Sequence, residues 1–134
     1  MVVFLIVLAI LILAAIFLLM FPVIKVVGDS MYPTLKEGQY LLGCRLFNKK
    51  KCKINGIYVV HLRDDEGEPY FIIKRLYMTY DKDHKVEYDF RGDNAEVSAD
   101  SRQYGNFKPS QVEAKIIGNF PNLAERRKSN EESN

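Results

Sequence analysis

The sequence predicts a mostly β protein, in which one N-terminal transmembrane helix precedes a single small, mainly antiparallel β domain. An uncharged apolar run extends from Met1 to Ile24. Segments rich in β-branched and aromatic residues follow it, and clusters of turn-forming residues separate them. No helical periodicity of similar length competes in that part of the chain. This spacing favours a β sandwich or a partly open barrel.

The apolar run is long enough to be a membrane anchor. As a helix, residues 1–24 would reach about 36 Å, against about 30 Å of bilayer hydrocarbon. A cleaved signal peptide fits less well, because no basic segment precedes the run and no small-x-small cleavage pattern follows it. We therefore expect a retained single-span anchor, whose regular helix ends at Pro22.

The charges around the anchor leave its orientation open. Lys25 is the first charged residue, so a simple positive-inside count would hold the following domain in the cytoplasm. That rule applies to short loops, however, and a domain of about 100 residues can cross the membrane largely regardless of its charge.

Residues 25–121 are enough for one domain with a single core. The expected strands are 39–46, 56–63, 69–77, 85–90 and 112–120. A long polar stretch over 91–109 separates the last two strands. Residues 122–134 carry few apolar and many charged side chains, which predicts a disordered tail.

The net charge of +2 does not indicate a nucleic-acid-binding protein. We interpret the local cluster of Lys49, Lys50, Lys51 and Lys53 as a solvated loop or a contact with anionic lipid headgroups.

Cys44 and Cys52 flank a loop between two expected strands, so they either form a disulfide or remain free thiols. With only His61 and His84 elsewhere, the spacing contains no paired metal-binding motif. We expect no metal and no cofactor.

Two residues could together carry nucleophilic chemistry. Ser30 lies no more than about 20 Å from the end of the apolar run, since extended chain advances about 3.3 Å per residue. A serine needs a neighbouring base to become nucleophilic. Lys74 lies in an expected strand on the same face as Ile72, where burial would lower its pKa and allow it to accept a proton. Alternatively, it is a surface lysine whose stem covers apolar neighbours.

Three segments together resemble the type I signal peptidases, the membrane-anchored serine/lysine proteases that remove signal peptides from exported proteins. The segment 28–35, GDSMYPTL, resembles the family's nucleophile box. Residues 73–75, IKR, resemble the segment with its general base, and 92–105, GDNAEVSADSRQYG, resembles its third box. The segments occur in the family's order after an N-terminal anchor, and the resemblance spans residues 1 to about 120.

The resemblance implies a role for each matching residue. Ser30 would be the nucleophile and Lys74 the general base, with Ser98 orienting the amine of Lys74. The backbone N–H of Ser30 would be one oxyanion-hole donor. Supporting roles fall to four residues, of which the last two would form an ion pair: Asp93, Asn94, Asp100 and Arg102.

A substrate pocket is also implied, which in the family accepts small side chains before the scissile bond. Met31 and Leu35 either line this pocket or belong to the core, and Ile72 and Ile73 are further candidates for its wall.

The chain departs from the family's pattern in three places. Gly28 stands where some members have a serine whose hydroxyl is a second oxyanion donor. The Gly-x-Pro-Gly-Asp turn that often follows the base is missing. The short interval between Arg75 and Gly92 leaves no room for a large inserted subdomain, so we expect a minimal version of the fold.

The resemblance predicts an endopeptidase at the plasma membrane whose partners are signal-peptide-bearing precursors and membrane lipid, not nucleic acid. Because signal peptides are cut on the exported side, the domain would face the extracytoplasmic side. Two other functions stay open: a non-catalytic membrane-anchored β domain for binding or assembly, and a self-cleaving serine/lysine repressor. The repressors carry a DNA-binding N-terminus, and here a membrane span occupies that place.

Overall fold

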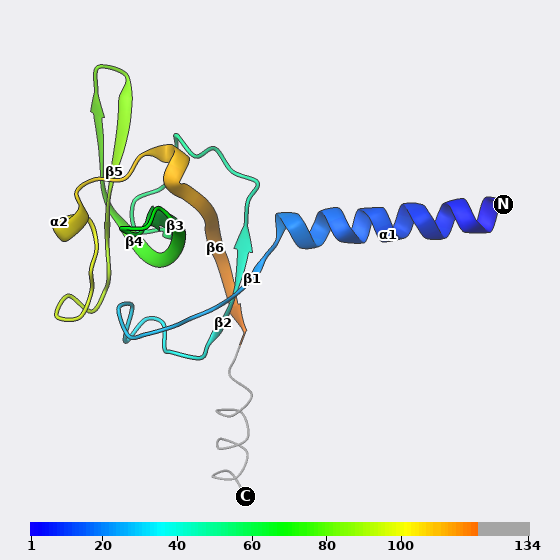
Figure 1. Cartoon of the computed structure of the whole chain (residues 1–134), viewed down its shortest axis with the longest axis horizontal. Coiled ribbons are helices and arrows are strands. Elements are labelled where there is room, and N and C mark those ends of the chain that lie inside the picture. Colours follow the sequence, from blue (N-terminus) through cyan, green and yellow to red (C-terminus); the bar gives the residue numbers. More distant parts are fainter. Residues whose placement is uncertain (121–134) are drawn as a thin grey trace, which may run out of the picture.

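A computed structural model describes residues 1–120 of the chain (Figure 1). Its elements, in order, are α1 (Val2–Met20), β1 (Val23–Lys25), β2 (Tyr40–Cys44), β3 (Ile57–Arg63), β4 (Pro69–Lys82), β5 (Lys85–Arg91), α2 (Ser101–Tyr104), η1 (Pro109–Gln111) and β6 (Val112–Phe120). The predicted tail at 122–134 lies outside the described residues.

The helix α1 projects from the β domain (Figure 1) and has no buried residue. It is long and apolar enough to cross a membrane, and it fits a single-pass anchor. It ends just before Pro22, as predicted, with Phe21 as its C-cap. The chain then forms β1, a short strand that the sequence did not indicate, because its apolar residues continue the composition of the anchor. The domain boundary at residue 24 stays a prediction.

The strands form one sheet in the order β1-β2-β6-β3-β4-β5, and every neighbouring pair is antiparallel. The predicted fold class is therefore confirmed. Each strand expected from the sequence is present, although β4 is longer because its second half pairs with β5 in a hairpin. The hairpin turns at Asp83 and His84, which both have positive φ, as two-residue turns between twisted strands require.

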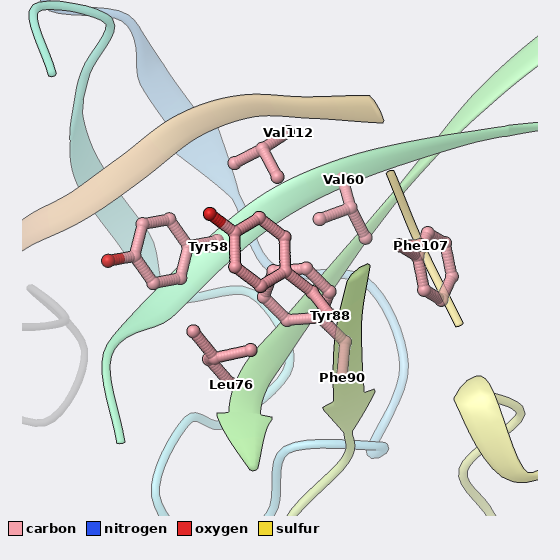
Figure 2. Close-up of a cluster of buried hydrophobic side chains, with 7 residues drawn as sticks. All are labelled: Tyr58, Val60, Leu76, Tyr88, Phe90, Phe107 and Val112. Carbon is pink, nitrogen blue, oxygen red and sulfur yellow. The ribbon is translucent and has the colours of Figure 1, made fainter. Parts of the chain in front are cut away.

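The domain buries two clusters of apolar side chains. The larger cluster is aromatic and links β3, β4, β5 and β6 (Figure 2): Tyr58, Val60, Leu76, Tyr88, Phe90, Phe107 and Val112. The smaller cluster lies under the chain that follows β1: Val26, Met31, Leu35 and Leu41. Because this smaller cluster includes residues on both sides of Ser30, it fixes the loop that presents the serine.

Cys44 and Cys52 are free thiols in the structure. Cys44 donates to the carbonyl of Leu46 and Cys52 to the carbonyl of Lys49, so each thiol has its own local partner. Of the two states left open by the sequence, the structure therefore contains the unbonded one.

Candidate active site

Ser30 lies on a loop whose flanking residues are held by the core. Met31 is 2% exposed and Leu35 is 5% exposed, and the N–H of Leu35 donates to the carbonyl of Met31 at 2.9 Å. The carbonyl of Ser30 itself accepts the N–H of Asn94 at 2.9 Å. These contacts fix the backbone of Ser30 from both sides.

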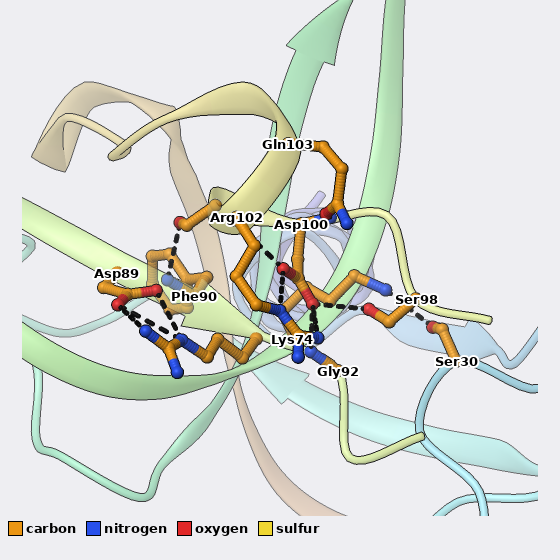
Figure 3. A network of polar contacts seen from close by, with 11 residues as sticks. Ser30, Lys74, Asp89, Phe90, Gly92, Ser98, Asp100, Arg102 and Gln103 are labelled. Atoms are coloured by element: carbon orange, nitrogen blue, oxygen red, sulfur yellow. Dashed lines mark hydrogen bonds and ion pairs between the residues drawn. The ribbon is translucent and has the colours of Figure 1, made fainter. Parts of the chain in front are cut away.

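Lys74 reaches Ser30 from the middle of β4. Its Nζ donates to Oγ of Ser30 at 2.7 Å (Figure 3), although the two residues are far apart in the sequence. Only 3% of the Lys74 residue is exposed. Burial lowers the pKa of Lys74 below the usual lysine value, while the charge of Asp100 raises it and that of Arg102 lowers it. The amine is therefore more easily deprotonated than that of a surface lysine.

Ser98 contacts a different partner from the one predicted. Its Oγ donates to Oδ2 of Asp100 at 2.6 Å (Figure 3). Within residues 1–120, no hydrogen bond joins Ser98 to Lys74. The carboxylate of Asp100 is the strongest acceptor near this hydroxyl, which explains the choice. In this geometry Ser98 connects Asp100 to the site instead of orienting the amine directly.

Asp100 is fully buried and accepts several hydrogen bonds. Arg102 donates to both of its carboxylate oxygens, at 2.9 and 2.7 Å, and forms the ion pair that the resemblance implies. The N–H of Gly92 donates to Oδ2 at 2.9 Å. Burial alone would raise the pKa of Asp100, but the bonds from Arg102, Ser98 and Gly92 hold it well below its usual range. The carboxylate therefore stays charged beside Lys74.

Gly92 occupies a position with no room for a side chain. A Cβ built there would lie 2.1 Å from Oγ of Ser98 and 2.5 Å from the carbonyl oxygen of Ser30. The absence of Cβ thus lets the third segment pack directly against the serine loop. The sequence motif contained this glycine but did not indicate the contact.

Asp93 and Asn94 join the serine loop to the sheet. Asp93 accepts two hydrogen bonds from Arg75, at 2.9 and 2.8 Å, and a further one from the hydroxyl of Thr34. Nδ2 of Asn94 donates to the carbonyl of Asp29 at 3.1 Å. The sequence pointed to Asp93 and Asn94, but it did not indicate that Arg75 and Thr34 are the partners of Asp93. The only signal for Arg75 was its place next to Lys74 in the matched segment.

A cleft of about 180 Å³ opens beside Ser30 and Lys74. Met31, Ile72 and Ile73, three of the candidates for a pocket wall, line it, although Met31 also packs in the smaller core cluster. Leu35 does not line it; this residue packs in the smaller core cluster with Val26 and Leu41, which corrects its candidate place in the pocket. Leu35 ends the turn that carries Ser30, so its side chain points into the domain.

The cleft lies between two strand edges without partners in the described part of the chain. The strand β1 ends the sheet and pairs only with β2. The strand β5 pairs with β4 only from Arg75 onward, so residues 70–74 have no neighbour on the side away from β3. Residues 25–28, which continue from β1, and residues 71–74 both line the cleft. An extended peptide inserted there could bond to both edges.

The comparisons with known proteins identify a family. A family model described as signal peptidase, peptidase S26, matches residues 1–79, more than half of the chain. The matched range contains Ser30 and Lys74 and ends before Gly92. No curated protein matches the chain closely enough to count as a relative.

Proposed function

Because the chain belongs to the signal peptidase family, peptidase S26, we propose that it is a membrane-bound endopeptidase that cleaves signal peptides from exported precursor proteins. Ser30 is the nucleophile and Lys74 the general base. The observation that carries this proposal is the 2.7 Å hydrogen bond between Lys74 Nζ and Ser30 Oγ, made by an amine that is almost fully buried. A non-catalytic β domain would have no need of this costly arrangement.

The reaction proceeds in two stages. Oγ of Ser30 attacks the scissile carbonyl carbon while its proton passes to neutral Nζ of Lys74. The tetrahedral intermediate then collapses, the C–N bond breaks, and Lys74 gives the proton to the leaving amine of the mature protein. In the second stage a water attacks the acyl-enzyme, Lys74 takes its proton, and Oγ of Ser30 leaves and recovers a proton.

The oxyanion is stabilised by the backbone N–H of Ser30. Such a donor typically contributes about 2.7–4 kcal/mol to the stability of the transition state. Gly28 has no side chain to supply a second donor; it has a φ of +78° and open space where a Cβ would stand. Its conformation suits the turn from β1 into the serine loop.

The polar groups around the dyad keep it in position. Asp100, held charged by Arg102, favours the protonated amine that forms during the reaction. Ser98 and Gly92 join that carboxylate to the wall of the site. Asp93 and Asn94 fix the serine loop against β4.

The substrate lies in the cleft as an extended strand. Both β1 and residues 71–74 run toward the dyad, and the precursor leaves the membrane in the same direction as α1 when both anchors share one topology. The precursor then runs parallel to both edges. The small volume of the cleft favours small side chains next to the scissile bond, because a larger side chain cannot enter a shallow pocket.

The anchor places the enzyme where its substrates are. With α1 across the plasma membrane and the β domain on the extracytoplasmic side, enzyme and precursor meet in two dimensions, which raises their effective concentration. Contacts of the domain with membrane lipid accompany this arrangement.

The direct test is processing of a signal-peptide-bearing precursor by the full chain in detergent, with the product mapped by mass spectrometry. The wild-type chain should cut at one bond, while Ser30→Ala and Lys74→Ala should each reduce the rate to background. Ser110→Ala and Lys82→Ala are matched controls, because both residues are exposed and lie away from the cleft. Cleavage that survives both dyad substitutions would contradict the assignment.

A further inference from the structure

A second cavity lies beside the cleft, at the point where the chain leaves the anchor. Its volume is about 290 Å³, and its walls are mainly apolar: Val23, Ile24, Val59, Phe71 and Ala114, with Arg45 at one end. We call it the exit cavity. It shares Ile24, Val59 and Phe71 with the cleft. The two hollows therefore form one groove that runs from Ser30 to the end of α1.

The membrane end of this groove is fixed by hydrogen bonds between the end of the anchor and residues 43–45, at the end of β2 and just beyond it. Nη1 of Arg45 donates to the carbonyl of Leu19 at 2.7 Å, and the backbone N–H of Arg45 donates to the carbonyl of Met20 at 2.9 Å. The N–H of Gly43 donates to the carbonyl of Pro22 at 2.8 Å. Three carbonyls at and just after the end of α1 are thus bonded to β2 and to the residue that follows it. The exit cavity consequently has a set place at the membrane surface.

The exit cavity exposes apolar surface that has no cover within residues 1–120. Val23 is 59% exposed and Phe71 is 61% exposed, although both belong to strands of the sheet. Exposed apolar groups that line a concave surface are typical of a binding site. The two charged residues that line the cavity, Glu113 and Arg45, have opposite signs, so the apolar walls and not a net charge set its preference.

The position of the cavity along the groove determines which part of a substrate would reach it. Gly28 lines the cleft and Val23 lines the exit cavity. A substrate strand that runs alongside residues 23–28 advances about 3.3 Å per residue, as the enzyme strand does. The substrate residue opposite Val23 therefore lies about five positions before the substrate residue opposite Gly28.

We propose that the exit cavity is a substrate subsite for an apolar side chain roughly four to six residues before the scissile bond, where the apolar helix of the precursor ends. This inference rests on the proposed function, because it assumes that a signal peptide occupies the groove. The occupant is an aliphatic or aromatic residue, since the walls offer apolar contact. An acidic residue at the same place would bind poorly.

The first experiment locates the substrate without requiring cleavage. Signal-peptide segments carrying one photoreactive phenylalanine analogue, moved in turn through the eight or so positions before the scissile bond, are crosslinked to the full Ser30→Ala chain in micelles. Crosslinks from the distant positions should map to Val23, Phe71 or their neighbours, and those from the nearest positions to the cleft. Distant probes that mark residues outside the exit cavity, or peptides that do not bind, would overturn the inference.

The second experiment measures specificity with the same Ser30→Ala chain. Leucine at the selected position should bind about fivefold tighter than alanine, as expected for partial burial of its extra apolar surface. Val23→Ser should reduce this preference to about twofold or less, because Val23 lines only the exit cavity of the two hollows. Ile117→Ser is the matched control, since this aliphatic strand residue is 49% exposed and lies outside both hollows. Equal loss in the control would contradict the subsite.

The two experiments also separate this inference from the proposed function. If the expected crosslinks and leucine preference appear but the wild-type chain cuts no precursor, the subsite stands and the endopeptidase activity is contradicted. If the wild-type chain cuts precursors but leucine and alanine bind equally, the activity stands and the subsite is overturned.

Discussion

Two carboxylates of the third segment, Asp93 and Asp100, are each paired with an arginine, yet they differ in what surrounds them. Asp100 is fully buried and bonds to its own segment, through Arg102 and Ser98. The side chain of Asp93 is 18% exposed and bonds to β4 through Arg75. One carboxylate thus organises the interior of the site around the base, while the other attaches the segment to the sheet. Substitutions of Asp93 and of Asp100 should consequently have different effects on stability and activity.

The largest effect is expected from Asp100→Ala. This change leaves the N–H of Gly92 and the hydroxyl of Ser98 without their acceptor inside the protein. We expect a loss of roughly 3 kcal/mol of unfolding free energy, at the low end for a broken buried pair because Arg102 is partly exposed. Misplacement of the dyad should lower kcat by about 100-fold. Denaturant unfolding and precursor cleavage measure the two losses.

The control for this substitution is Asp65→Ala, which removes an exposed carboxylate of the turn before β4. It should change neither stability nor activity measurably. An Asp100→Ala chain as stable and active as this control would refute the organising role of Asp100.

Gly92→Ala tests the close contact on which both carboxylates depend. The new methyl group would overlap Oγ of Ser98 and the carbonyl of Ser30, so one of the two segments must move. We expect a loss of about 1–3 kcal/mol in unfolding free energy, as for other overpacked sites. We also expect kcat to fall by a factor larger than this loss of stability alone would cause. Gly118→Ala is matched, because nothing lies within 4 Å of a Cβ built at Gly118. Similar kcat values for the two variants would show that the contact is not needed.

Asp93→Asn should have a smaller effect than either. The substitution removes the charge that pairs with Arg75 while keeping one acceptor oxygen. Because the pair is partly exposed, about 1 kcal/mol of stability should be lost. A loss of about 1.4 kcal/mol in positioning the serine loop would correspond to a tenfold lower kcat/KM. If Asp93→Asn were as damaging as Asp100→Ala in both assays, the two carboxylates would not have separate roles.

The pH dependence of cleavage distinguishes the carboxylates most sharply, although the shift is the smallest effect. Lys74 must be neutral to accept a proton, so activity should rise with pH through its pKa, which burial lowers below the usual lysine value. The charge of Asp100 raises that pKa, so Asp100→Asn should move the rising limb to lower pH. Asp93→Asn should leave it in place. Profiles of kcat/KM against pH on a soluble peptide test this; equal shifts in both variants would contradict it.

Much of the fold could be predicted because its signals are local. The anchor follows from an uninterrupted apolar run, and the strands from alternation between turn clusters. The strand β1 was missed, because it has only three residues, and the two apolar ones continue the composition of the anchor without a period of their own. The length of β4 beyond residue 77 was also missed, since its pairing with β5 depends on the hairpin turn and not on composition.

The candidate site was predictable in its residues but not in all its contacts. The matched segments pointed to Ser30 and Lys74, and the structure brings these side chains together. The hydrogen bond of Ser98 to Asp100 could not be inferred, because both Asp100 and Lys74 were available partners in the sequence. Likewise, Arg75 and Asp93 are separated by 18 positions and meet only through the fold. Distances across the chain are set by packing, which local patterns do not record.

The two unpaired strand edges that line the cleft have a consequence for proofreading at the membrane. A strand inside a folded sheet already has its backbone groups bonded to neighbouring strands, so these groups cannot also bond to the two edges beside the cleft. Only a segment that has not yet folded can enter and bond on both sides. The cleft would thus select first for an unfolded segment and only then for a particular sequence. Folded proteins at the same membrane surface would not be cleaved.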